Sequence, residues 1–166
     1  MTVIINPSTS AISAIARQVA QTADRHDTDA DIVHAVLSQI SLEDFELQDQ
    51  QAWVKILNSL LDVTRSRKVG VANVRVTQEA NLASNGSSTR SSLEIVSDDY
   101  PFLVDSFKMV LEALGISCYA IVHPVLSVAR DGKGALTAVP GPIKESVVWM
   151  EIERQNAETA DKLIAA

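Results

Sequence analysis

Apolar residues recur at helical spacing over the first 68 residues of the chain. An α-helix buries one face when apolar side chains return every three or four positions. Ser8 or Ser10 is placed to cap the first helix, and the stripe that begins at Trp53 is the strongest. The three stripes are Ile12, Ile15, Val19 and Ala23; Ile32, Val36 and Ile40; and Trp53, Ile56, Leu57, Leu60 and Leu61. The pattern predicts a helical subdomain of about three helices in residues 1–68.

After Lys68 the period of the apolar residues changes to two, which is typical of strands. The segments VGVANVRVT (69–77) and SLEIVS (92–97) are therefore predicted strands. Residues 79–92 are rich in Ser, Asn and Gly and almost free of apolar side chains. This composition predicts a loop or a linker.

Further strands are predicted in the second half of the chain. The segment ISCYAIVHPVLSVARD (116–131) predicts one long strand that bends, bulges or lies at an edge at Pro124, because proline has no N–H to donate to a ladder. ARDGKGAL (129–136) predicts a hairpin turn, and VPGP (139–142) predicts a loop. SVVWMEIE (146–153) predicts another strand. Its expected buried face is Val148, Met150 and Ile152.

The segment NAETADKLIAA (156–166) begins a helix that the chain end cuts short, which predicts an excised piece of something longer. From Ser92 onward the expected order is strand, helix, strand, strand and the start of a helix. An antiparallel sheet with helices packed on one face, of the ferredoxin-like type, is the economical arrangement of these elements. The predicted fold class is therefore α+β, with a helical subdomain in residues 1–68 and an α/β sandwich domain in residues 69–166 that is truncated at its last helix.

Two adjacent acidic residues, Asp98 and Asp99, precede an apolar run. Pro101 suits the first turn of a helix, because its missing N–H needs no partner there. Asp98 and Asp99 are then placed to accept the free N–H groups and to face the positive end of the helix dipole. The expected buried stripe is Leu103, Phe107, Val110 and Leu114, with Gly115 as the left-handed end. We predict that the acids cap this helix, whereas Asp105 faces water or serves a ligand or an interface.

The composition limits the classes of function. The chain is 46% hydrophobic and 21% charged with a formal net charge of −7, which fits an ordinary soluble protein that repels phosphate backbones. The basic residues Arg65, Arg67 and Lys68 have no aromatic stacking partner beside them, and we expect them to complement the end of the preceding helix. No run of about 18 consecutive apolar residues occurs. We expect no nucleic-acid partner and no membrane partner. We also expect a cytoplasmic protein, because a single cysteine fits a reducing compartment.

Three blocks in the second half resemble one specific family. They are IVSDDYPFLVDS (95–106), HPV (123–125) followed by a basic residue and Asp131, and WMEIE (149–153). In this order they resemble the N-terminal region of the very large bacterial NAD-specific glutamate dehydrogenases. The same stretch is similar, more distantly, to ACT domains. The resemblance implies an ACT-like sheet domain with the element order derived above.

The resemblance also implies a parent enzyme that converts L-glutamate, NAD and water into 2-oxoglutarate, ammonium and NADH. It places the catalytic and NAD-binding region elsewhere in that polypeptide, so for this chain alone we expect no catalytic residue, no cofactor and no metal. The expected partners are the remaining domains of the parent, further copies in a homo-oligomer and an amino-acid effector. The chain is then a regulatory or assembly domain, with a stand-alone ACT-type amino-acid sensor as the alternative.

Individual residues leave further alternatives open. ACT domains bind amino acids near the first strand-to-helix turn, commonly where Gly follows Pro, but here Phe102 fills that space. His123 fits a partly buried, hydrogen-bonded side chain better than a ligand, and Cys118 fits core filling better than a nucleophile. Trp149 anchors packing or marks contact with a missing domain or subunit. A small enzyme using Asp98, Asp99 and His123 is a third hypothesis. The residues kept as ligand or interface candidates are Asp98, Asp99, Phe102, Asp105, His123 and Trp149.

Overall fold

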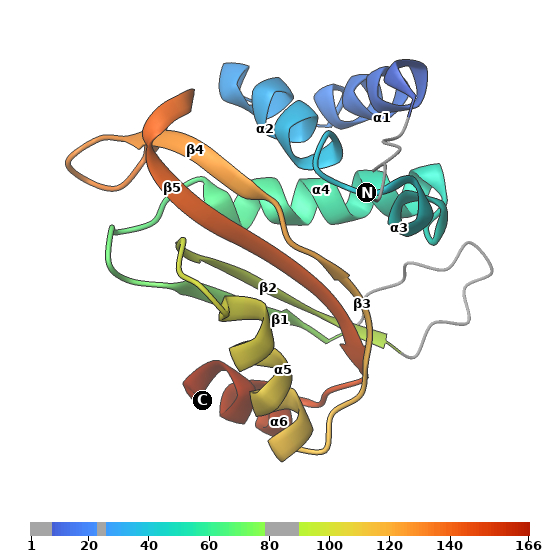
Figure 1. The fold of residues 1–166 in the computed structure, drawn as a ribbon, viewed down its shortest axis with the longest axis vertical. Coiled ribbons are helices and arrows are strands. Elements are labelled where there is room, and N and C mark those ends of the chain that lie inside the picture. The colour runs from blue at the N-terminus through green and yellow to red at the C-terminus, as the bar shows by residue number, and fades with distance from the viewer. Residues whose placement is uncertain (1–7, 23–25, 79–89) are drawn as a thin grey trace.

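A computed structural model describes residues 8–22, 26–78 and 90–166 of the protein (Figure 1). The helices are α1 (Thr9–Ala20), α2 (Asp27–Leu37), α3 (Leu42–Glu46), α4 (Gln50–Thr64), α5 (Leu103–Ala113) and α6 (Ala157–Ala165). The strands are β1 (Asn73–Thr77), β2 (Arg90–Asp98), β3 (Cys118–Val122), β4 (Val125–Arg130) and β5 (Leu136–Glu153). The expected loop in residues 79–92 falls largely outside the described residues.

The N-terminal helices begin at the caps that the sequence offers. The hydroxyl of Ser8 accepts the N–H of Ala11 at 3.3 Å at the start of α1, and Asp49 does the same for Ala52 at 2.8 Å at the start of α4. The predicted stripe of α4 is buried along its whole length. The structure adds the short helix α3, capped by Ser41, to the three helices that we expected.

All strands of the described chain form one antiparallel sheet around β5. The hydrogen-bonded order is β1-β2-β5-β3, and β4 also pairs with β5. The register places Ile95 of β2 opposite Val148 of β5. The strand is interrupted between β3 and β4 at His123 and Pro124, which confirms the interruption that we expected at this proline. The hairpin predicted in residues 129–136 is also present, and the Asp131 carboxylate accepts backbone N–H groups within it.

Helices cover both faces of this sheet (Figure 1). Helices α5 and α6 pack on the face that carries the predicted core residues Val148, Met150 and Ile152. The opposite face, with Trp149 of β5, packs against α2 and α4 in a second apolar cluster, and α1 packs on these two helices. Residues 8–64 therefore close one side of the sheet with their buried stripes. Trp149 is 1% exposed within this cluster, so its ring packs against the chain's own helices.

The α+β class and an antiparallel sheet with α5 and α6 on one face are confirmed. The domain boundary that we expected at residue 68 stays a prediction. Helix α5 ends as expected, because Gly115 has a φ of 70° and its N–H donates to Glu112 O. The N–H of Ile116 completes the motif by donating to Leu111 O at 2.8 Å.

Two expected segments differ from the structure. The predicted loop VPGP lies inside β5, where the register with β4 shifts between Val128 and Ala129. A Cβ on Gly141 would stand 2.1 Å from Val128 C, so only glycine allows this close backbone approach. The first strand begins at Asn73 rather than at residue 69, because the preceding backbone is held by polar contacts described below.

The prediction that Asp98 and Asp99 cap helix α5 is wrong. Helix α5 begins at Leu103, and its N-cap is Phe102, which has a φ of 64° and makes no side-chain capping bond. Strand β2 extends to Asp98, so the two acids lie before a turn rather than at the first helical N–H groups. Their carboxylates bind partners elsewhere in the chain.

Candidate functional site

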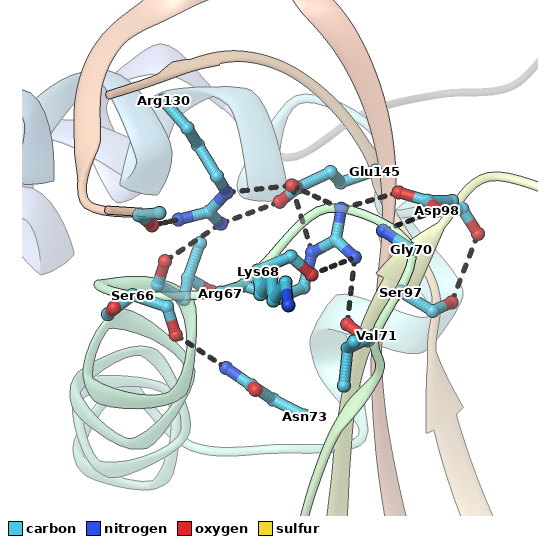
Figure 2. Close-up of polar contacts among 12 residues, drawn as sticks. Ser66, Arg67, Lys68, Gly70, Val71, Asn73, Ser97, Asp98, Arg130 and Glu145 are labelled. Atoms are coloured by element: carbon cyan, nitrogen blue, oxygen red, sulfur yellow. Dashed lines mark hydrogen bonds and ion pairs between the residues drawn. The ribbon is translucent and has the colours of Figure 1, made fainter. Parts of the chain in front are cut away.

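A buried network of charged side chains joins the helical half to the sheet (Figure 2). Arg67 follows α4, whereas Arg130 ends β4 and Glu145 lies in β5. The side chains of Arg67 and Glu145 are each 0% exposed, and that of Arg130 is 1% exposed. Buried charges need partners of opposite sign, so this cluster is the strongest candidate for a built polar site.

Both arginines bind the carboxylate of Glu145. Arg130 approaches it as a fork, with Nε 2.8 Å from Oε1 and Nη2 2.7 Å from Oε2. Arg67 donates from Nε at 3.0 Å and from Nη2 at 2.7 Å, both to Oε1. Such charge-assisted bonds are among the strongest in proteins. Glu145 is therefore fixed from two sides.

Asp98 completes the network from the end of β2. Its Oδ1 accepts Arg67 Nη2 at 2.6 Å, and its Oδ2 accepts the N–H of Gly70 at 3.0 Å. Arg67 Nη1 also donates to Val71 O at 2.9 Å. These contacts hold the backbone just before β1, which explains why the strand begins only at Asn73.

The pKa shifts follow from these contacts. The hydrogen bond from Arg67 lowers the pKa of Asp98, and it outweighs the opposing effect of burial. Burial would raise the pKa of Glu145, but the bonds from Arg130 and Arg67 lower it below its ordinary value. Burial likewise opposes the charge of Arg67, but the two carboxylates raise its pKa. All three groups are therefore held in their charged forms.

The remaining donors of the arginines bind main-chain oxygens. Arg130 Nη2 donates to Thr64 O at 2.9 Å, and its Nη1 donates to Gly134 O at 3.0 Å. Arg67 N–H also donates to Gly134 O at 2.9 Å. The network thus connects the end of α4 with the hairpin between β4 and β5. The network is a structural connection, because the N–H groups of the two arginines donate to oxygens of the same chain.

Asp99 and His123 meet at a different residue, Ser146. The Ser146 hydroxyl donates to Asp99 Oδ1 at 2.6 Å, and His123 Nε2 lies 3.1 Å from Ser146 Oγ. Because the hydroxyl proton is directed to Asp99, the imidazole is the donor to Ser146. A serine nucleophile requires the reverse, with the imidazole accepting the hydroxyl proton. Burial lowers the pKa of His123, although Asp99 partly opposes this shift.

The other candidates from the sequence lie apart from these clusters. Phe102 is 77% exposed and Asp105 is exposed on α5. Trp149 is buried under the helices and lines one edge of a cavity of about 340 Å³ beside β3. Cys118 lines the same cavity, and burial raises the pKa of its thiol. A raised pKa disfavours the reactive thiolate.

Sequence reasoning missed Arg67, Arg130, Glu145 and Ser146. Arg67 was expected only to complement the end of α4, yet it lies 31 positions from Asp98 and 78 from Glu145. Local spacing gives no sign of contacts at such separations. A second buried acid, Glu94, was missed for the same reason. Its carboxylate accepts Ser59 Oγ at 2.8 Å and Arg75 Nε at 2.8 Å, and thereby ties α4 to the sheet.

Residues 8–22, 26–78 and 90–166 contain no group of three or more His, Cys, Asp or Glu side chains arranged to hold a metal ion. Within the same ranges, no helix has the length and apolar character needed to cross a membrane.

Comparison with known proteins finds that the chain is similar to a small part of NAD-specific glutamate dehydrogenases. The NAD-specific glutamate dehydrogenase of Pseudomonas aeruginosa is 36% identical over 74 residues, which cover 40% of this chain and 5% of the relative. The enzyme of the same name from Halomonas elongata is 33% identical over 76 residues, which cover 42% of this chain and 5% of the relative. No solved structure matches. The model of the family "Glutamate dehydrogenase, ACT1 domain" matches residues 32–166, so the chain belongs to this family.

Proposed function

We propose that the chain is a non-catalytic domain that serves assembly or allosteric control in an NAD-specific glutamate dehydrogenase. The observation that carries this proposal is that the acidic candidates Asp98 and Asp99 bind side chains within the chain itself. Asp98 binds Arg67, and Asp99 accepts the hydroxyl of Ser146. Both arrangements favour a rigid scaffold over an acid–base centre, because the acids are committed to partners within the fold.

The parent reaction in this proposal is the oxidation of L-glutamate by NAD and water to 2-oxoglutarate, ammonium and NADH. The chain spans 5% of the length of the curated relatives that it matches, which leaves room for the reaction in other parts of such a polypeptide. We assign NAD binding to those parts.

The strand-to-helix turn of this chain does not fit a dinucleotide. A pyrophosphate binds where a glycine-rich turn exposes the N–H groups of a helix. Here the carboxylates of Asp98 and Asp99 lie just before the turn that leads into α5, and the N-cap of this helix is the bulky Phe102. Negative charge repels a pyrophosphate at this position, so no step of the reaction is assigned to this turn.

Amino-acid binding is the second candidate function, which is supported by membership of the ACT1 family and by a cavity of about 340 Å³ in the chain. Pockets of this size accept small molecules. The cavity is lined partly by Trp53, Trp149 and Lys108, which offer apolar walls and one cation. Titration calorimetry of the purified chain with a panel of amino acids tests this role. Binding that Lys108→Ala weakens would favour a sensor, and the lack of a heat signal would remove its support.

The main proposal is tested by an NADH-formation assay with L-glutamate and NAD. We expect no turnover from the purified chain, because the proposal assigns the reacting groups to another part of the parent. Turnover above the background of a heat-denatured sample, abolished by Ser146→Ala, would contradict the proposal and favour the small enzyme that uses Asp98, Asp99 and His123.

A further inference from the structure

Helix α5 exposes an apolar stripe on the side away from the sheet. Its inner face packs on the core through Val104, Phe107 and Leu111. Phe102, the N-cap just before the first turn, is 77% exposed, and Met109 within the helix is 69% exposed. Ser106 and Ala113 are exposed at the positions between and after them. Phe102, Ser106, Met109 and Ala113 form what we call the α5 stripe.

The backbone at Phe102 is strained where the side chain is exposed. Its φ of 64° makes it the sole residue other than glycine with a positive φ in the described part of the chain. A bulky side chain in this region costs free energy of about 1 kcal/mol or more, and such residues concentrate at binding sites. A phenylalanine that is both strained and exposed contributes little to the core. Its position favours contact with another molecule.

Acidic side chains border the α5 stripe on one side. Asp105 and Glu112 are exposed and lie seven positions apart, so they follow the same edge of the helix. Within the described residues, neither makes an ion pair with a basic side chain. Lys108 lies between them along the helix, three positions after Asp105 and four before Glu112, and also lines the cavity beside β3, so two acids and one base share this side of the helix. The edge of the stripe is therefore net negative.

We propose that the α5 stripe binds an amphipathic helix with apolar residues at its contact positions and Lys or Arg along its flanks. An elongated stripe with spacing four, three and four matches a second helix, which offers the same spacing. Basic flanks complement Asp105 and Glu112, and they increase the association rate and the selectivity. This inference rests on the proposed assembly role and identifies the surface that performs it.

A second copy of the chain fits the stripe less well. Two α5 helices packed antiparallel about a twofold axis place like edges side by side. Asp105 of each copy would then approach Glu112 of the other, and like charges repel at such contacts. The occupant is therefore a basic helix rather than another α5.

The test uses two synthetic helical peptides that share leucines at the contact positions. One carries lysines along both flanks, and the other carries glutamates at the same positions. Fluorescence anisotropy of the labelled peptides, titrated with the purified chain, measures their affinities. We expect the lysine peptide to bind at least about tenfold more tightly than the glutamate peptide, a change worth 1.4 kcal/mol. Added salt should reduce this difference by screening the charges.

Two variants separate binding from folding. Phe102→Gly removes the exposed ring and also relieves the strain, because glycine adopts a positive φ without steric cost. It should keep the thermal stability of the chain and weaken binding of the lysine peptide by about tenfold. Ile164→Ser is the matched control, because Ile164 is 45% exposed on α6, outside the stripe. Its affinity should equal that of the unchanged chain.

Charge reversal tests the chemistry of the partner. The double variant Asp105→Lys and Glu112→Lys should bind the glutamate peptide in preference to the lysine peptide. Equal affinities for both peptides, or affinity that Phe102→Gly leaves unchanged, would overturn the inference. Self-association of the chain in sedimentation velocity that Phe102→Gly abolishes would also overturn it, in favour of a second copy. None of these outcomes involves NADH formation, so they are distinguishable from failure of the proposed function.

Discussion

Arg67 directs every nitrogen of its guanidinium to a partner within the chain. Nε and Nη2 donate to Glu145, Nη2 also donates to Asp98, and Nη1 donates to two backbone oxygens. A lysine at this position has one ammonium and no planar fork, so it cannot reproduce this set of bonds. The residue therefore joins three segments that are far apart in the sequence.

Substitution of Arg67 tests the strength of this joint. Arg67→Met removes the charge but retains much of the apolar volume, and it leaves Asp98 and one side of Glu145 without their buried cation. Loss of one partner from a buried pair typically costs about 3 kcal/mol or more. We expect a decrease of about 3 kcal/mol in the free energy of unfolding, measured by urea denaturation. Arg17→Ala, at an exposed position of α1, is the control and should change this free energy by less than about 0.5 kcal/mol. An equal effect of both substitutions would contradict the structural role of Arg67.

Gly141 tests a different residue-scale constraint. Gly141→Ala places a Cβ 2.1 Å from Val128 C and 2.2 Å from Ala129 N, so the backbone of β4 or β5 has to move. We expect a loss of about 2 kcal/mol or more in thermal or urea unfolding, as for overpacked sites. Gly132→Ala is the matched control, because nothing lies within 4 Å of its Cβ and its φ is not positive. A neutral Gly141→Ala would show that the approach of the two strands is looser than described.

Local residue signals were predictable where the partner lies within one turn. Ser8 as a cap and Gly115 as a left-handed helix end are confirmed, because a cap binds only its neighbours. The same reasoning gave the wrong result for the acids Asp98 and Asp99. Asp98 is a residue type that caps helices, but a buried arginine 31 positions away competes for it, and a bond in which both donor and acceptor are ionised is stronger than a bond to a neutral helix N–H.

At the scale of elements, β5 is the central strand, because three of the other described strands pair with it. It runs from Leu136 to Glu153 and pairs with β2, β3 and β4. The prolines and glycine of residues 139–142 predicted a loop because they are typical of turns. In the structure the same residues form an irregular part of the strand at the register shift with β4. Such bulges depend on the partner strand, which the local composition does not describe.

The start of β4 is held by a side chain from the helical half. Gln39, just after α2, donates from Nε2 to Val125 O and accepts the N–H of Val125 at its Oε1, both at 2.9 Å. The amide thus occupies the hydrogen-bonding edge of Val125 as a neighbouring strand would. Unpaired strand edges are prone to wrong pairing, so this contact also protects the sheet.

Removal of this amide should loosen one end of β4 only. Gln39→Ala should lower the free energy of unfolding by about 1 kcal/mol, the net value of a typical hydrogen bond. It should also accelerate amide hydrogen exchange at Val125 relative to the centre of β5. Gln18→Ala, at an exposed position of α1, is the control. Unchanged exchange at Val125 would show that the edge is held by other contacts.

At the scale of the whole molecule, one sheet separates two apolar cores. The run from Val147 to Met150 is buried at every position, so β5 has no solvent face there. We predicted only one buried face, because alternation is the ordinary pattern of an antiparallel strand. The continuous apolar run was the available signal for coverage on both sides. The helical half supplies that coverage, and the charged network fixes it to the sheet.

The pH dependence of stability tests this arrangement as a whole. In the folded state the pKa values of Asp98 and Glu145 lie below their ordinary values of 3.8 and 4.5. The unfolded chain therefore binds protons first as the pH falls, and their stabilising contribution, complete above the ordinary values, is lost through that acidic range. The pKa of His123 is also lowered from 6.5, so protonation of the unfolded chain begins to reduce stability already below that pH.

Urea denaturation at a series of pH values separates the two contributions. We expect the free energy of unfolding to fall gently below pH 6.5 and more steeply below pH 4.5, where the carboxylates begin to titrate. His123→Gln should flatten only the gentle part of the curve. Glu145→Gln should be destabilised at neutral pH, because two buried arginines lose their carboxylate, and its deficit should shrink as the unchanged protein loses the same charge in acid. A deficit that stays constant down to the acid transition would mean that the ionised form of Glu145 does not hold the helices to the sheet.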